Sequence, residues 1–422
     1  MKLKIAFFTL IFLTLLLGSS SSGKASPPQP QRIRQVAQLM GDGYNQLFGY
    51  TVAISGNTLA VGDPFDDQYG EEAGSVTIFQ ADFAGHWVAI TRLTASDAEE
   101  GIRFGHSLAL SGNILVVGAP YANDFGLHSG AVYIFERDHG GSNAWGQTAR
   151  LTSSDAFTND QFGWAVDVHG STVASGAYTK SYGGRVYIYE RDAGGPGAWG
   201  ETAQLNPDPP GFVACFGHAL DLDGDLLAVG AYGGGDYSGN AYVFQRQPNT
   251  GQWQKLSSFR AADTYAYHYF GYSIALDGWT VLVGAPGVGS LAGAAYIFTS
   301  DPAHPQDWIE QAQLTASDGA MGDYFGLNLD LSGEVAWIGA PMHMDGTGAV
   351  YIYGLDQGGA GFWGEITSVQ GDDSAAGDQF GDATSIDGNM AAAGAPGKLP
   401  SGSLYIFNLN PPWLSHLPLM IR

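Results

Sequence analysis

The chain has 422 residues, a formal net charge of -24 and only 17 lysines and arginines. Nucleic acid and anionic membranes are held by basic side chains, so this charge argues against both as partners. Charged residues make up only 14% of the chain while glycine occupies 62 positions, which is typical of many short strands joined by tight turns.

The N-terminal 25 residues predict a secretory signal peptide. Two lysines precede an apolar run from Ile5 to Leu17, and small residues then lead to a cleavage position near Ala25. The run is too short to span a bilayer as a helix, and no later stretch is long and apolar enough. We therefore expect an exported protein with a polar leader at residues 26–31 and no transmembrane segment once the signal peptide is removed.

A repeated stretch organises the rest of the chain. Its most constant feature is a Phe-Gly pair that recurs seven times, at intervals of 54 to 58 residues. Each full copy holds four short runs rich in β-branched and aromatic residues, and Gly, Pro, Asn or Asp bound each run. Four antiparallel strands per repeat are the content of one propeller blade. The pairs are Phe48-Gly49, Phe104-Gly105, Phe162-Gly163, Phe216-Gly217, Phe270-Gly271, Phe325-Gly326 and Phe380-Gly381.

The two ends of the array predict how the ring closes. Fourth strands follow the first six copies, each near a recurring Trp, whereas the seventh copy stops after its third strand at Asn408. Residues 32–40, RIRQVAQLM, read as a fourth strand with no copy before it. We predict that this strand completes the last blade, because a closed ring leaves no unpaired edge where its ends meet. The predicted fold is an all-β, seven-bladed β-propeller of four-stranded antiparallel blades at residues 32–408, followed by a C-terminal tail at 409–422.

Phe-Gly at the start of a blade and Gly-Ala-Pro at the end of its second strand resemble the FG-GAP repeat family. The family forms the propeller of integrin α chains and also occurs in exported bacterial proteins. Gly-Ala-Pro is intact in four copies, beginning at Gly118, Gly284, Gly339 and Gly394, and altered at Gly62, Gly176 and Gly230. The resemblance implies a secreted or cell-surface bacterial protein that binds ligands.

In the family that this chain resembles, several integrin blades hold Ca²⁺ in an extended acidic loop between the first two strands. Here that loop is a tight turn in every copy, and only Asp221, Asp223 and Asp225 keep a trace of the acidic pattern. A turn this short cannot surround an ion that needs six or more oxygen ligands. We therefore expect no cofactor, with Ca²⁺ conceivable only at carboxylates elsewhere in the chain.

One such set of carboxylates lies seven residues before Phe-Gly in five copies. A short acidic side chain at a constant place in a loop is most often a turn former that accepts nearby backbone N–H groups. The alternative is a cation site that each shares with a second carboxylate, such as Asp160, Asp323 or Asp378. The five candidate metal ligands are Asp97, Asp155, Asp263, Asp318 and Asp373.

Several single residues have a structural and a functional interpretation. Asp167, Asp221 and Asp330 are predicted to face the central channel, as solvated lining or as a cation site. His106 and His218, which follow Phe-Gly, are predicted to be packing residues rather than a zinc pair. The recurring Trp is interpreted as an anchor rather than a sugar platform. Cys215, the only cysteine, is interpreted as a small buried residue, with a reactive or intermolecular thiol as the alternative.

Loops that join the second and third strands vary most between copies. Together with the loops before Phe-Gly they are expected on one face, because alternate hairpins of an antiparallel blade share a side. Tyrosine gives contact area at low entropic cost, so this face is the predicted ligand surface. The candidate residues are Asp66, Asp67, Tyr69, Tyr121, Asp124, Tyr178, Tyr182, Tyr232, Tyr237, Tyr265, Tyr267 and His268.

The predicted function is therefore a non-catalytic binding or adhesion module that presents an acidic, aromatic face to an extracellular protein or glycan. One alternative is a propeller enzyme, a lyase or hydrolase, with a pocket at the mouth of the channel; only analogy between folds supports it. Another is a structural component of the cell envelope, for which the C-terminal tail would be the active part.

Overall fold

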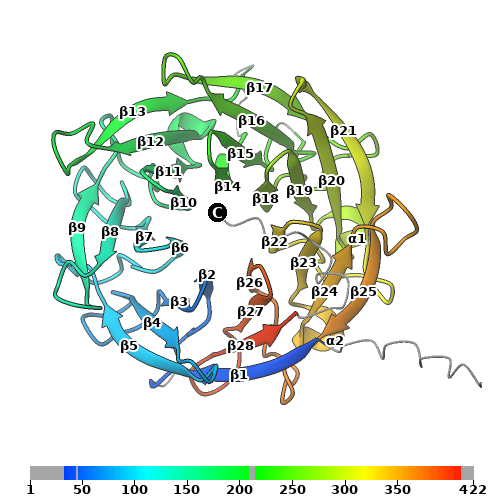
Figure 1. Ribbon diagram of the computed structural model, residues 1–422, viewed down its shortest axis with the longest axis horizontal. Coiled ribbons are helices and arrows are strands. Elements are labelled where there is room, and N and C mark those ends of the chain that lie inside the picture. Colours follow the sequence, from blue (N-terminus) through cyan, green and yellow to red (C-terminus); the bar gives the residue numbers. More distant parts are fainter. Residues whose placement is uncertain (1–32, 44–45, 209–213, 235, 410–422) are drawn as a thin grey trace, which may run out of the picture. The chain divides into compact units, whose positions relative to one another are not determined.

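The computed structural model describes residues 33–43, 46–208, 214–234 and 236–409. The predicted signal peptide, the leader and the tail from residue 410 onward lie outside the described residues. The described residues form seven four-stranded antiparallel sheets, placed as blades around a central axis (Figure 1). The predicted seven-bladed propeller is confirmed.

The strands follow the sequence prediction closely, with four strands per blade and the first strand innermost. Blade 1 consists of β2 (Thr51–Ser55), β3 (Thr58–Asp63), β4 (Ser75–Ala81) and β5 (Trp87–Leu93); blade 2 of β6 (Ser107–Ser111), β7 (Ile114–Ala119), β8 (Ala131–Arg137) and β9 (Trp145–Leu151); and blade 3 of β10 (Val166–His169), β11 (Thr172–Ala177), β12 (Arg185–Arg191) and β13 (Trp199–Leu205). Blade 4 consists of β14 (Phe216–Asp223), β15 (Leu226–Ala231), β16 (Asn240–Arg246) and β17 (Trp253–Phe259), and blade 5 of β18 (Ile274–Asp277), β19 (Thr280–Ala285), β20 (Ala294–Asp301) and β21 (His304–Leu314). Blade 6 consists of β22 (Leu329–Ser332), β23 (Val335–Ala340), β24 (Ala349–Gly354) and β25 (Gly364–Val369), and blade 7 of β26 (Ala383–Asp387), β27 (Met390–Ala395), β28 (Ser403–Asn408) and β1 (Arg34–Met40).

Strand β1 closes the ring as predicted. It pairs antiparallel with β28, from Arg34 opposite Asn408 to Met40 opposite Ser403. Blade 7 therefore joins the two ends of the described chain, and Leu409, which was assigned to the tail, is buried with its N–H donating to the carbonyl of Asn389 at 2.7 Å.

Three short helical segments lie in the loops: η1 (Lys180–Tyr182), α1 (Val288–Leu291) and α2 (His343–Gly346). Within the described ranges, no helix has the length and apolar character needed to cross a membrane. The fourth strands depart slightly from the prediction, because β21 begins four residues before its Trp and β25 begins one residue after its own. The anchoring interpretation of this Trp agrees with the burial of four of its six copies: Trp145, Trp199, Trp253 and Trp308.

The Phe-Gly and Gly-Ala-Pro motifs meet at the contacts between blades. Six of the seven Phe side chains have no exposed surface, and Phe162 packs edge-on against Tyr187 with ring centroids 5.5 Å apart. Gly163, with φ of 86°, donates its N–H to its own blade's Gly176. A Cβ added to Gly118 of the preceding blade would lie 2.1 Å from the carbonyl oxygen of Gly163. Both glycines are therefore required for the blades to approach this closely.

The hydrophobic core lies between neighbouring blades. One cluster combines Val116 and Val132 of blade 2 with Val173 and Tyr187 of blade 3. Such clusters repeat around the ring, so each blade buries one face against the next. Stability thus depends on blade-to-blade packing, as in other repeat architectures.

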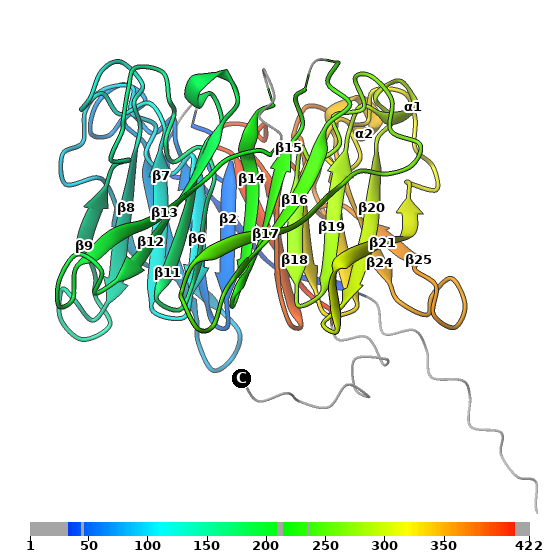
Figure 2. The same cartoon turned by 90° about the horizontal axis from the view of Figure 1, so that it is seen from above.

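Two sets of loops share one end of the ring, which Figure 2 shows in side view with α1 and α2. The 2–3 loops join the second and third strands, and their described residues are 64–74, 120–130, 178–184, 232–234 with 236–239, 286–293, 341–348 and 396–402. The entry loops lead from a fourth strand into the next blade, and their described residues are 41–43 with 46–50, 94–106, 152–165, 206–208 with 214–215, 260–273, 315–328 and 370–382. We call the surface formed by both sets the loop face.

Candidate functional site: the loop face and the central channel

Backbone hydrogen bonds tie each 2–3 loop to the next entry loop. Asn159 donates its N–H to the carbonyl of Leu127 at 2.8 Å, and Phe162 donates to Ser129 at 3.2 Å. In six of the seven 2–3 loops, the Gly that ends the loop also bridges to the Phe of the next Phe-Gly pair, as Gly130 does with Phe162. The loop face is therefore a framework in which neighbouring loops are connected through their backbones.

Exposed apolar side chains concentrate on the loop face. Among the described residues, 17 large apolar side chains are exposed, and ten of them lie in the 2–3 and entry loops. Sequence reasoning identified only the three tyrosines, because an apolar residue in a loop looks the same in sequence whether it points inward or outward. The ten are Tyr69, Phe125, Leu127, Phe157, Tyr265, Tyr267, Met321, Met342, Met344 and Leu399.

Nine of the twelve candidate ligand residues fall into three groups, and His268, Tyr237 and Tyr182 stand outside them. The first group is exposed on the loop face, and Tyr237 stacks on Tyr267 of this group with ring centroids 6.0 Å apart. The second group is covered: Asp66 has no exposed surface and accepts a hydrogen bond from Gln46 at 2.9 Å, so it cannot contact a ligand. His268 is half-buried beside Tyr265, and Tyr182 lies in η1. The exposed group is Asp67, Tyr69, Asp124, Tyr265 and Tyr267.

Tyr121, Tyr178 and Tyr232 form the third group, beside the mouth of the channel. They pack on a belt of five aromatic rings supplied by the residue after Phe-Gly in blades 1 to 5. Centroids of successive belt rings are 5.7, 4.4, 5.7 and 4.6 Å apart. The belt consists of Tyr50, His106, Trp164, His218 and Tyr272.

The two histidines of the belt are packing residues. Burial lowers the pKa of both His106 and His218 to about 4, so the imidazoles are neutral near pH 7. Trp164 contacts both rings and stands between them. This arrangement agrees with the packing interpretation of the two residues.

The five carboxylates before Phe-Gly accept hydrogen bonds from side chains rather than from turn N–H groups. The Tyr187 hydroxyl donates to Asp155 at 2.6 Å, and a tyrosine at the same place in the third strand donates to Asp263, Asp318 and Asp373. Asp97 instead pairs with Arg150 at 2.7 Å. The sequence carried a signal for this contact, since the third strand of six of the seven blades has Tyr at that position.

The turn formers are the second carboxylates of the same loops. Asp160, Asp323 and Asp378 each accept the backbone N–H of the residue three positions earlier, at 2.7, 2.8 and 2.9 Å. Each is also paired with a basic side chain, as Asp160 is with Lys180 at 2.6 Å. Within the part of the chain that the structure describes, no three His, Cys, Asp or Glu side chains are grouped as a metal site.

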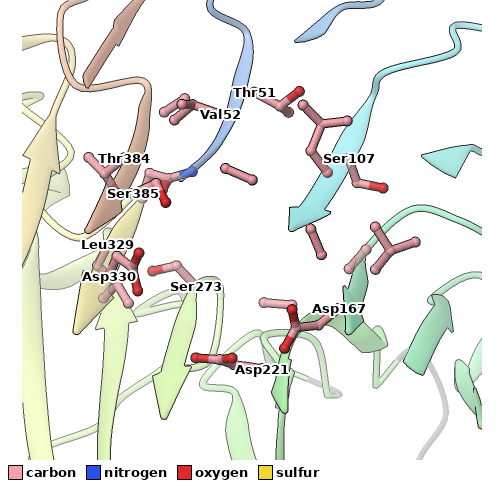
Figure 3. Close-up of a pocket in the computed structure, with 18 of the residues that line it drawn as sticks. Thr51, Val52, Ser107, Asp167, Asp221, Ser273, Leu329, Asp330, Thr384 and Ser385 are labelled. Atoms are coloured by element: carbon pink, nitrogen blue, oxygen red, sulfur yellow. Dashed lines mark hydrogen bonds between the residues drawn. The ribbon is translucent and has the colours of Figure 1, made fainter. Parts of the chain in front are cut away.

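The central channel holds a cavity of about 410 Å³, lined by the innermost strands. Asp167, Asp221 and Asp330 lie on its wall (Figure 3). Each accepts a backbone N–H from the innermost strand of the next blade: Leu222 at 2.6 Å, Leu276 at 2.6 Å and Ile386 at 2.8 Å. An innermost strand has an unpaired edge, so these carboxylates satisfy N–H groups that no strand can reach.

Burial makes these channel carboxylates weak acids. It raises the pKa of Asp330 to about 8, and it raises the pKa of Asp167 and of Asp221, which lie close enough to repel each other when ionised. At the mouth of the channel, burial raises the pKa of Asp382 to about 6.

Comparison with protein-family models matches the FG-GAP repeat along most of the chain, at residues 41–79, 87–135, 145–189, 199–244, 253–298, 308–353 and 363–407. The chain belongs to the FG-GAP repeat family. Its seven FG-GAP repeats build an integrin-α-like propeller, a fold typical of extracellular binding modules. No curated protein matched the chain.

The first FG-GAP repeat has Gly62-Asp63-Pro64 in place of Gly-Ala-Pro, directly where its 2–3 loop begins. Asp63 replaces the Ala of Gly-Ala-Pro and is 2% exposed, with one oxygen accepting the N–H of Leu47 at 3.2 Å. Burial raises the pKa of Asp63 to about 7. The neighbouring Asp66 is held by Arg92, so blade 1 buries two carboxylates in and beside its 2–3 loop.

Proposed function

We propose that this FG-GAP propeller is an exported, non-catalytic binding or adhesion module that uses its loop face to hold an extracellular partner. One observation carries the proposal: ten exposed large apolar side chains gather on the loop face. Soluble monomers seldom expose apolar surface in such concentration, and where they do it often marks an interaction site.

The charges of the loop face favour a protein partner over a glycan. Arginines in or next to these loops are mostly neutralised locally, as Arg103 is by Glu72 at 2.7 Å and Arg185, the first residue of β12, is by Asp155 at 2.5 Å. By contrast, several exposed carboxylates form no ion pair with any described residue. A partner with basic groups around an apolar centre would complement this surface. The unpaired carboxylates are Glu71, Glu99, Glu100, Asp345 and Asp372.

The channel supports the non-catalytic part of the proposal. Its three wall carboxylates are used as acceptors for backbone N–H groups, a structural role that leaves each with one oxygen already bonded. An enzyme at the channel mouth would need groups that converge on a substrate, and the aromatic belt there is packed against itself. The enzyme alternative therefore has no particular observation in its favour.

A matched pair of variants tests the proposal. Phe125→Ser with Leu127→Ser and Phe157→Ser removes one apolar cluster from the loop face. Phe83→Ser with Phe362→Ser removes exposed rings from the hairpins at the opposite end, and serves as the control. Both variants should unfold at the wild-type temperature because the altered side chains are exposed.

The assay is binding to immobilised extracellular proteins, basic ones included, and to a glycan array. We expect the wild type and the control to bind a protein ligand, and the loop-face variant to lose about tenfold or more in affinity. Equal binding by both variants would refute use of this part of the loop face. Binding confined to the glycan array would assign a glycan partner instead.

A further inference from the structure

Three blades hold the two carboxylates of their entry loop with a cation from their own 2–3 loop. The second carboxylate follows the first by five residues, and the cation follows the first by 25 residues, in all three blades. Blade 3 uses Lys180, whose ammonium lies 2.6 Å from Asp160 and 3.5 Å from Asp155. Blade 7 uses Lys398, at 2.9 Å from Asp378 and 3.4 Å from Asp373.

Blade 6 has a histidine at the same position. His343 is 4% exposed; its Nδ1 lies 2.8 Å from Asp323 and its Nε2 lies 3.7 Å from Asp318. A neutral imidazole carries one N–H and one lone pair, so one of these carboxylates would face a lone pair. The imidazolium presents N–H groups to both and matches the lysines of blades 3 and 7. When charged, the ring would therefore pair with both carboxylates of its loop, as each of the two lysines does.

The two loops joined by His343 carry all the exposed methionines of the loop face. Met321 lies in the entry loop between the two carboxylates and is 79% exposed. Met342 and Met344 flank His343 in the 2–3 loop and are 37% and 60% exposed. The imidazole is therefore the side-chain link between two segments that present one apolar part of the loop face, which we call the methionine arc.

We propose that His343 is a proton-dependent latch, which holds the methionine arc in place when charged and releases it when neutral. Its effect on partner binding rests on the proposed function; the loop movement does not. Loss of the proton leaves two carboxylates against a neutral ring, and these carboxylates then repel each other and draw in water. The arc should be ordered at mildly acidic pH and open at alkaline pH.

The groups that face His343 support this direction. The entry loop contributes Asp318 and Asp323, and β24 contributes Tyr351, whose hydroxyl donates to Asp318 at 2.6 Å and whose ring centroid is 6.0 Å from that of His343. Asp345 follows on α2 itself. Among the described residues, His343 is the only basic side chain that forms an ion pair with Asp318 or Asp323.

Global stability is a poor readout, because Asp63 and Asp330 titrate in the same pH range. We would therefore measure hydrogen exchange of peptides from residues 315–324 and 341–348 at about pH 5.5 and about pH 8.5, corrected for the intrinsic rate. The lysine-held loops at residues 152–161 and 396–402 are controls within the same molecule. His343→Lys copies those loops, and His343→Gln removes the charge at both pH values.

In the wild type, blade 6 peptides should exchange about tenfold faster at the higher pH, the effect of losing one charge-assisted contact, while the control loops stay constant. His343→Lys should abolish the pH response. His343→Gln should exchange fast at both pH values. A blade 6 response that persists in His343→Lys, or an equal response in all three blades, would overturn the latch.

Partner affinity measured at the same two pH values separates this inference from the proposed function. A latch that acts on binding should weaken the complex at high pH in the wild type and leave His343→Lys unaffected. If exchange responds as expected while affinity does not change, the latch stands and the partner does not contact the methionine arc. If no partner binds the loop face at all, the proposed function fails while the exchange result is unaffected.

Discussion

Asp330 offers the sharpest test of how the channel wall contributes to stability. Burial raises its pKa from an ordinary value of 3.8 to about 8, so the folded protein holds this proton more tightly than the unfolded chain does. Its contribution to the free energy of unfolding is therefore complete below pH 4. It is lost progressively as pH rises toward about 8.

The change to make is Asp330→Asn, which removes the titration and keeps one oxygen to accept the N–H of Ile386, while the oxygen that accepts the N–H of Leu331 is replaced by an amide NH2 group. The full shift would correspond to about 6 kcal/mol at about 1.4 kcal/mol per pH unit. The side chain retains contact with water in the channel, so we expect about a third of this, ~2 kcal/mol. With an unfolding entropy of about 2.1 cal/mol/K per residue, that is a shift of about 2 to 3 °C in the unfolding midpoint.

The assay is thermal unfolding of the wild type and Asp330→Asn from about pH 4.5 to about pH 9, with the exposed Asp307→Asn as control. Relative to the wild type, the variant should gain ~2 kcal/mol of stability from low to high pH, because it lacks the titration, while the control follows the wild type throughout. Asp63 and Asp382 titrate in the same window, so part of the slope should remain in the variant. Parallel profiles for the wild type and Asp330→Asn would refute the reasoning.

Three further outcomes are expected. Gly339→Ala should lower the free energy of unfolding, measured with denaturant, by about 3 kcal/mol, because the added methyl would lie 2.0 Å from the Gly381 carbonyl oxygen. Gly388→Ala is the control: its methyl would lie in open space at φ of 56°, so it should lower the same free energy by only about 1 kcal/mol. Equal losses in the two variants would contradict the close contact between blades. The unfolding midpoint should not change between EDTA and millimolar Ca²⁺, because basic partners already hold the entry-loop carboxylates; a rise of several degrees would assign cation sites. N-terminal sequencing of the exported protein should begin just after Ala25, and an uncleaved N-terminus would reject the signal peptide.

The sequence alone determined the architecture. Phe-Gly recurs at intervals of 54 to 58 residues, and each full copy holds four runs of strand length. The last copy lacks its fourth strand, and an additional strand precedes the first copy. These patterns are local and repeated seven times, so a strand that is ambiguous in one repeat can be assigned from the same position in the other repeats. Even the closure of blade 7 by β1 follows from counting strands.

The loop face was only partly predictable, because its chemistry depends on contacts between distant residues. Asp66 looks like a surface carboxylate in sequence, yet it is buried under Gln46 and Arg92. Phe157 looks like a core residue, yet it is 69% exposed. No periodicity governs which way a loop side chain points, so burial is decided by the neighbouring loops.

The partners of the entry-loop carboxylates also required the tertiary structure. Asp318 was predicted to be a turn former; the recurring third-strand Tyr pointed to Tyr351, but nothing near Asp318 in sequence indicates His343, 25 residues onward. The ring brings these residues together because the entry loop and the 2–3 loop of one blade emerge at the same end of its strands. The repeat pattern thus determined where the strands lie, whereas the charge and exposure of the loop face were decided by side-chain packing across loops, which a one-dimensional pattern does not contain.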